Sequence, residues 1–244
     1  MAAAPCGVKG AGRTDGMNDQ RPIPTMRRAS GPGLPPPPPV VWAMAIIFAV
    51  LELVSQLGSF GLHFRIMMVE RFAFFDFWLD ELTAGRPVPF EFWTSFFTYG
   101  FLHGGALHLL MNGAIFLGVG GLLANLLGTG RFLALFFFSS ATGALIWGLV
   151  YSGGPAAHLV GASGALFGFI GALKRWEWRW MRLTGSPRQR FWGTIFALAL
   201  LNLLLVIGAP GGAEVAWEAH LGGFLGGWLI APLLAPGRAA PSPI

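Results

Sequence analysis

Between residues 40 and 235 the chain alternates long apolar runs with short polar segments. We expect helices over six apolar runs, at residues 40–62, 104–127, 132–151, 161–173, 191–207 and 219–234. Because a helix needs about 20 apolar residues to cross ~30 Å of hydrocarbon, most of these helices are long enough to span a membrane. The run at 161–173 is too short, so its helix is expected to begin at membrane depth, beside water or protein. The pattern predicts an all-α, polytopic membrane protein with a six-transmembrane-helix bundle.

The two ends of the chain differ from this apolar part. Residues 1–39 are rich in Gly, Pro, Arg and Ala and end in the run Pro35 to Pro39, without apolar periodicity. Such a composition is typical of a disordered tail with a stiff polyproline exit. We therefore expect a disordered cytoplasmic tail at 1–39, one membrane domain at 40–235 and a short cytoplasmic tail at 236–244.

The segment after the first apolar run, residues 63–97, is long and rich in aromatic residues. Charges interrupt it too often for it to cross a membrane, and its composition is typical of short helices lying in an interface. We expect a long interfacial first outer loop, which either anchors the protein or shapes access to a buried site. In the run before it, Glu52, Ser55, Gln56 and Ser59 form a polar stripe that we expect to bond to the second helix or to this loop.

Composition and charge agree with a membrane protein. Hydrophobic residues make up 54% of the chain and charged residues 11%, against roughly a quarter charged in soluble proteins. The net charge is +5, but the basic residues are scattered beside apolar runs and form no continuous basic face, so no nucleic-acid partner is expected. With the N-terminus inside, thirteen Lys and Arg residues fall on inner segments and three on outer ones. We therefore expect both termini to be cytoplasmic, in a membrane of the bacterial inner type.

Ser163 is the strongest candidate for chemistry. It lies in Gly161-Ala162-Ser163-Gly164, where an apolar, glycine-punctuated helix begins. Free amides at a helix N-terminus can stabilise the oxyanion that forms when a serine attacks a carbonyl. Serine is also common packing material in glycine-rich membrane helices, so this motif does not identify an active site by itself.

His220, at the outer start of the last apolar run, is the candidate general base. Gly223 and Gly227 share its helix face, so a neighbouring helix could approach closely there and bring His220 to Ser163. Without a catalytic partner, His220 would be an ordinary interfacial histidine. Apart from Glu214 and Glu218 in the outer loop, no acidic residue lies near Ser163 or His220 in the sequence, so a serine–histidine pair is expected and not a full triad.

Two further polar residues, His108 and Asn112, are four apart and share a face at the outer end of the second apolar run. They could donate hydrogen bonds to an oxyanion, or simply bond to other helices. A metal site made from His103, His108 and His220 would lack a carboxylate or cysteine ligand, so we expect no metal. Asn202 is expected to hydrogen-bond across helices.

Taken together, Gly161-x-Ser163-Gly164, Ala219-His220-x-x-Gly223 and His108-x-x-x-Asn112 resemble the rhomboid family of intramembrane serine proteases. The resemblance covers about residues 40–235 and includes the long first outer loop. It implies that Ser163 is the nucleophile, that His220 is the base and acid, and that His108 and Asn112 bind the oxyanion.

The resemblance also assigns supporting positions. Phe167 stands where the family often has a tyrosine that stacks beneath the histidine, and His103 fits the stretch Phe101-Leu102-His103. Trp93-Thr94 departs from the Trp-Arg often found in the family's first loop. Substrate-binding or structural roles are therefore expected for a set of residues that comprises Gly161, Gly164, Phe167, His103, Trp93, Gly223 and Gly227.

The implied activity is that of a serine endopeptidase that needs no cofactor and cleaves transmembrane segments of membrane proteins through an acyl-enzyme. Its partners would be transmembrane protein substrates and membrane lipids. The alternative is a catalytically silent relative that binds transmembrane clients in the same groove. A transporter that uses Glu52 and the histidines is disfavoured, because we see no pair of broken helices in two repeats.

Overall fold

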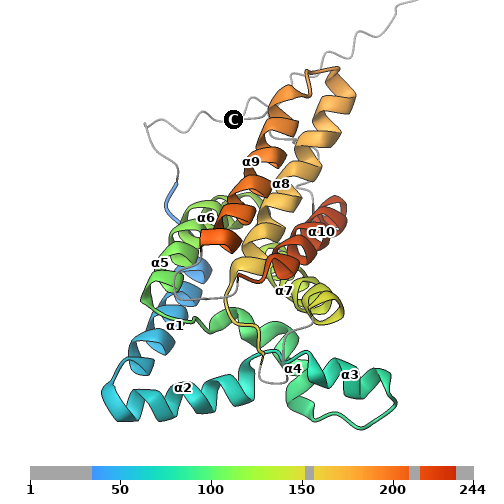
Figure 1. Ribbon diagram of the computed structural model, residues 1–244. Coiled ribbons are helices and arrows are strands. Elements are labelled where there is room, and N and C mark those ends of the chain that lie inside the picture. The colour runs from blue at the N-terminus through green and yellow to red at the C-terminus, as the bar shows by residue number, and fades with distance from the viewer. Residues whose placement is uncertain (1–34, 152–156, 209–214, 235–244) are drawn as a thin grey trace, which may run out of the picture. The chain divides into compact units, whose positions relative to one another are not determined.

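The computed structural model describes residues 35–151, 157–208 and 215–234, all within one compact unit that begins at Leu34. Most of the predicted N-terminal tail and all of the predicted C-terminal tail lie outside these residues. The described part is helical, with one isolated bridge between Phe74 and Leu159 (Figure 1). Its helical elements are α1 Pro39–Ser55, α2 Gly58–Phe72, α3 Phe77–Thr83, α4 Phe90–Thr98, η1 Tyr99–Phe101, α5 Ala106–Ile115, the π-helical η2 Phe116–Gly120, α6 Gly121–Leu127, α7 Thr129–Val150, α8 Ser163–Thr184, α9 Gln189–Gly208 and α10 Trp217–Leu234.

Three of the described helices are long and apolar enough to cross a membrane: the continuous stretch Ala106–Leu127, then Thr129–Val150 and Gln189–Gly208. The predicted all-helical membrane protein is therefore confirmed, whereas the count of six spans is not. The other three predicted runs form helices too, but α1 is short, charges begin halfway along α8, and α10 starts with polar residues. Phe191 is the buried residue of α9, so almost the whole apolar surface of this helix faces outward.

Two predicted helix boundaries were wrong. The first helix ends at Ser55 and not at residue 62, because the chain turns at Leu57 and Gly58, where Gly58 adopts a left-handed φ of 57°. The helix predicted at 161–173 runs instead from Ser163 to Thr184. Its apolar pattern stops at Lys174, but the residues that follow still favour a helix, and Lys174 pairs with Glu177 one turn later at 2.6 Å.

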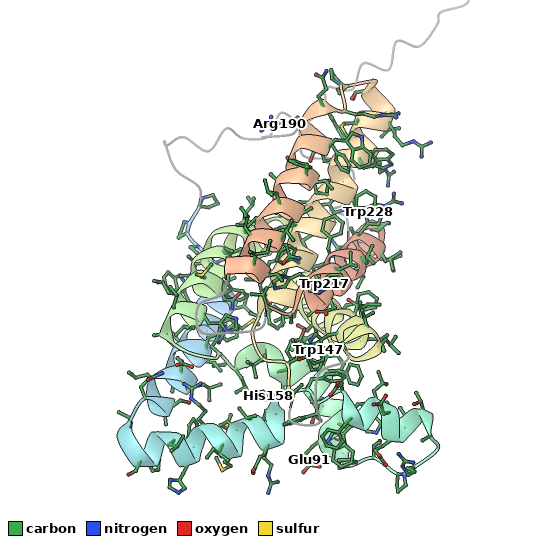
Figure 2. All side chains as sticks on the ribbon, viewed as in Figure 1. Glu91, Trp147, His158, Arg190, Trp217 and Trp228 are labelled. Carbon is green, nitrogen blue, oxygen red and sulfur yellow. The ribbon has the colours of Figure 1, made fainter. Side chains whose placement is uncertain are left out.

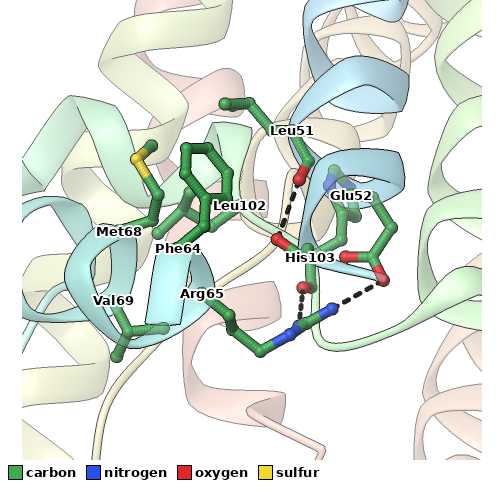
Figure 3. Close-up of a pocket in the computed structure, with 9 residues that line it drawn as sticks. Leu51, Glu52, Phe64, Arg65, Met68, Val69, Leu102 and His103 are labelled. Carbon is green, nitrogen blue, oxygen red and sulfur yellow. Dashed lines mark hydrogen bonds and ion pairs between the residues drawn. The ribbon is translucent and has the colours of Figure 1, made fainter. Parts of the chain in front are cut away.

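The predicted outer loop folds into the short helices α2, α3 and α4, and an ion pair ties it to α1. Glu52 of α1 is buried and accepts a hydrogen bond from Arg65 of α2 at 2.8 Å. The same guanidinium donates to the main-chain oxygen of His103 at 2.9 Å, beside a cavity of about 20 Å³ (Figure 3). The prediction that Glu52 bonds to the first loop is confirmed. Within the stripe, the Gln56 amide at the end of α1 donates to the Glu52 carboxylate at 2.6 Å, whereas Ser59 lies on α2.

Helices α7, α8 and α10 cross in close contact because glycines line their interfaces. A β-carbon on Gly223 of α10 would overlap the carbonyl oxygen of Gly164 of α8, and one on Gly227 would overlap the carbonyl oxygen of Gly168. On the α7 side, a β-carbon on Gly143 would lie 3.0 Å from the Ala219 oxygen. Backbones can meet this closely only where side chains are absent. Figure 2 places Trp147 on α7 and Trp217 on α10 in this part of the molecule, with Glu91 and Arg190 well to either side of it.

Replacing Gly223 with alanine should force α8 and α10 apart. We expect Gly223→Ala to lower the free energy of unfolding by about 1 to 3 kcal/mol, the usual range for overpacking a close interface. The matched control is Gly113→Ala on α5, where a β-carbon would meet nothing within 4 Å. Unfolding of both variants in detergent by heat or SDS tests the expectation, and equal stability of the two would contradict it.

Candidate functional site

Ser163 is the first residue of α8 and is half-buried. The turn before it requires Gly161, whose φ of 115° is strained for any other residue. Space also requires glycine there, because a β-carbon would lie 2.7 Å from Nε2 of His108. The Gly161 N–H donates to the main-chain oxygen of Tyr99 at 3.0 Å, which fixes the turn against the chain that leads into α5. Ser163 is thus presented at a helix N-terminus by a turn that is fixed in space.

His220 lies on α10, is buried, and is held by two neighbours. Its ring stacks on Phe167, one turn after Ser163 on α8, with centroids 4.2 Å apart and planes within 8°. Its Nδ1 lies 2.6 Å from Oδ1 of Asn202 on α9. Because an amide oxygen only accepts hydrogen bonds, Nδ1 carries the hydrogen and Nε2 is left as an acceptor.

Ser163 on α8 and His220 on α10 both lie where these two helices cross. The residues next to them in the sequence, Gly164 and Ala219, are in contact, since a β-carbon on Gly164 would lie 3.5 Å from the main-chain oxygen of Ala219. Within the described residues, the side-chain hydrogen bond of His220 goes to Asn202 and not to Ser163. Catalytic hydrogen bonds are often long without substrate and shorten when it binds.

His108 and Asn112 approach the turn before Ser163 from α5. His108 Nδ1 accepts a hydrogen bond from the Gly104 N–H at 3.2 Å, so its other nitrogen, Nε2, carries the hydrogen. That Nε2 faces Gly161, and the Asn112 amide nitrogen lies 3.7 Å from the same β-carbon position. Asn112 Nδ2 is buried and has no hydrogen-bond partner in the described part of the chain. Two N–H donors therefore converge beside the turn that leads into Ser163.

Of the other predicted site residues, His103 lies against His108, whereas Trp93 has no described contact with Ser163 or His220. His103 packs against Phe48 and edge-on against His108, and burial lowers the pKa of His103 to about 4, so its ring is neutral. Its main-chain oxygen accepts a hydrogen bond from Arg65, and both of its buried ring nitrogens have no hydrogen-bond partner in the described part of the chain. Trp93 is half exposed on α4, where its ring meets Phe92 and no described contact joins it to Ser163 or His220.

The sequence did not predict the contacts of two residues that hold this region together. Asn202 was predicted to bond across helices, and this is confirmed, but its partner His220 could not be predicted from an isolated amide in an apolar run. Tyr99 was not singled out at all. It is buried, donates its hydroxyl hydrogen to the Ser140 main-chain oxygen at 2.9 Å, and would lie 2.8 Å from a β-carbon on Gly164.

These features define a class: an integral membrane protein with a serine at a helix start, a stacked histidine on the adjoining helix, and amide and imidazole donors nearby. The chain belongs to the rhomboid family, because the family model described as Rhomboid domain matches residues 89–237. The resemblance in the sequence motifs is thereby confirmed.

The curated relatives that the chain matches come from several organisms. The chain is 30% identical over 148 residues to "Rhomboid protease GluP" of Bacillus subtilis (strain 168), which covers 60% of this chain and 27% of that protein. It is 36% identical over 136 residues to "RHOMBOID-like protein 5" of Arabidopsis thaliana, covering 53% and 40%. It is 35% identical over 128 residues to "Rhomboid-like protease 3" of Toxoplasma gondii, covering 52% and 46%. The chain thus spans less than half the length of each of these relatives.

Proposed function

We propose that this protein is an intramembrane serine endopeptidase with Ser163 as nucleophile and His220 as general base. One observation carries the proposal: His220 is stacked on Phe167 and hydrogen-bonded through Nδ1, so its basic Nε2 is free at the level of Ser163. A buried imidazole with one nitrogen bonded and the other free is the arrangement that general-base catalysis requires. Membership of a family with protease-named relatives supports the same reaction.

In the proposed reaction, Ser163 Oγ attacks the carbonyl carbon of a substrate peptide bond while His220 Nε2 takes the hydroxyl proton. The imidazolium that forms keeps its Nδ1–H on the Asn202 oxygen. It then returns the Nε2 proton to the departing amine, and the C–N bond breaks to leave an acyl ester on Ser163. Water, deprotonated by the same nitrogen, hydrolyses this ester and restores the hydroxyl.

Negative charge on the carbonyl oxygen needs donors that are already in place. His108 Nε2–H and Asn112 Nδ2 face the turn before Ser163, and the amides at the start of α8 are free of helical bonding. In a buried site such donors stabilise the transition state far more than they would in water. We assign them to the oxyanion.

The proposed substrates are transmembrane segments of membrane proteins, cut where their helix is weakened. A peptide bond inside an intact helix is shielded, so segments loosened by Gly or Pro are the expected targets. We further propose that the chain has six membrane spans, that both termini are cytoplasmic and that the membrane is a bacterial inner membrane.

The second candidate function is that of a catalytically silent relative. Such a protein would bind transmembrane clients in the same groove without cleaving them.

Ser163→Ala should abolish cleavage of a reconstituted transmembrane substrate while the protein stays folded. The reason is that alanine removes only the attacking oxygen. The same variant should lose labelling by a fluorophosphonate, and His220→Ala should label far more slowly than the parent. Ser186→Ala, outside the proposed site, serves as the control. Cleavage that persists in Ser163→Ala would exclude this nucleophile, and a parent that neither cleaves nor labels would favour the silent relative.

Asn112→Ala should lower kcat by about 100- to 1000-fold, the usual effect of losing one oxyanion donor, with little change in KM. The matched control is Asn125→Ala on α6, whose amide nitrogen is already bonded to the Pro36 and Gly121 main-chain oxygens. Steady-state cleavage in proteoliposomes measures both. An unchanged kcat in Asn112→Ala would remove this residue from the oxyanion site.

A further inference from the structure

Asn202 is a polar side chain in the apolar second half of α9. The segment Ile195–Ile207 of α9 has no other polar residue. A polar side chain in such a helix is costly unless it finds a partner, and Asn202 finds the imidazole of His220 at 2.6 Å. The bond joins two helices at the proposed catalytic base.

We propose that Asn202 is a positioning residue that sets the tautomer of His220, an inference that rests on the proposed function. Stacking on Phe167 fixes the plane of the imidazole but leaves open which nitrogen carries the hydrogen. The Asn202 oxygen settles this, because it accepts only from Nδ1–H and so leaves the lone pair on Nε2. Asn202 does for His220 what an acidic residue does in a full triad, without bringing a second charge into the membrane.

The role of Asn202 can be separated from simple helix packing. We expect Asn202→Leu, which keeps the volume but not the acceptor, to lower kcat about tenfold with KM unchanged and the protein still folded. Asn202→Asp, which keeps an oxygen acceptor, should restore most of the rate. Thr194→Val is the control on the same helix, because the Thr194 hydroxyl bonds only within α9, to Arg190. Equal rates in Asn202→Leu and the parent would overturn the proposal, and so would failure of the aspartate variant to recover.

A second readout does not depend on activity. In protein labelled with ¹⁵N-histidine, the His220 signal, identified by its loss in His220→Gln, should report a hydrogen on Nδ1 in the parent and a mixture of tautomers in Asn202→Leu. An inactive parent with this tautomer shift would reject the proposed protease while supporting the positioning role. A signal that is the same in both proteins would reject the positioning role.

At the other end of α8, a cavity of about 270 Å³ opens between this helix and the end of α10. Three arginines at helical spacing line the cavity: Arg175, Arg179 and Arg182. The rest of its wall includes Trp176, Trp178 and Pro232. The wall is fixed, since Trp176 Nε1 donates to the Ala231 oxygen at 2.9 Å and the Arg175 guanidinium lies 5.4 Å from the Trp228 ring centroid.

The cavity is strongly basic. Residues 174–190 hold six Lys and Arg residues and one acid, Glu177, which is already paired with Lys174. Arg179 and Arg182 are exposed and have no carboxylate within ion-pair distance in the described part of the chain. At ~1.5 Å per residue, Arg175 to Arg182 lie roughly 18 to 28 Å along α8 from Ser163. Figure 2 shows the Arg190 end of α8 and α9 lying away from the outer-loop helices.

We infer that this cavity binds the phosphate of an anionic phospholipid. Guanidinium groups bind phosphate through paired hydrogen bonds, and basic pockets between membrane helices hold anionic headgroups. Tryptophans favour the same interfacial depth. A lipid fits better than free phosphate, because Leu183 lines the cavity and Leu233, next to Pro232, is 82% exposed, so an acyl chain has an apolar surface to follow.

Native mass spectrometry of the full chain in detergent, with phosphatidylglycerol added against phosphatidylcholine, tests this site. We expect selective retention of phosphatidylglycerol, and about 30-fold weaker retention in Arg179→Gln/Arg182→Gln, since each basic residue near an anionic headgroup is worth about fivefold. Arg131→Gln is the control, an exposed basic residue at the start of α7, outside the cavity. Equal loss in the control would show a general charge effect and overturn the site. Displacement of the lipid by millimolar inorganic phosphate would overturn the lipid as ligand.

Discussion

The close crossing of α8 and α10 is the constraint on which the rest of the structure depends. Carbonyl oxygens of Gly164 and Gly168 occupy the positions where β-carbons of Gly223 and Gly227 would stand. At this close approach no side chain fits between the two backbones. Main-chain contacts therefore set the position of Ser163 relative to His220.

His108 and His220, near this crossing, are held in opposite tautomers. Each is hydrogen-bonded to a neighbouring group that can only donate or only accept. The Gly104 N–H can only donate, so it leaves a hydrogen on Nε2 of His108. The Asn202 oxygen can only accept, so it leaves a lone pair on Nε2 of His220. The proposed roles need this difference, because an oxyanion requires a donor and a serine hydroxyl requires an acceptor.

The sequence predicted the long helices from apolar periodicity, and it singled out Ser163, His220, His108 and Asn112 as candidates because polar residues stand out in apolar runs. It failed where local chemistry overrides that pattern. Gly58 bends the chain inside what reads as one apolar run, and α8 continues through charged residues that still favour a helix. The contacts of Asn202 and Tyr99 could not be predicted, because each depends on which helices cross and not on spacing along one of them.

The unpartnered amide of Asn112 gives the proposed chemistry a physical rationale. A buried donor without a partner costs about 1 to 3 kcal/mol, and folding alone would favour an apolar residue in its place. Asn112 Nδ2 is such a donor in the described part of the chain, and it faces the turn before Ser163. The free-energy cost of leaving Asn112 Nδ2 without a partner is understandable if its hydrogen-bond acceptor arrives only with the substrate. An oxyanion that forms during reaction is such an acceptor, so a donor left free in the resting protein binds the transition state more strongly than the ground state.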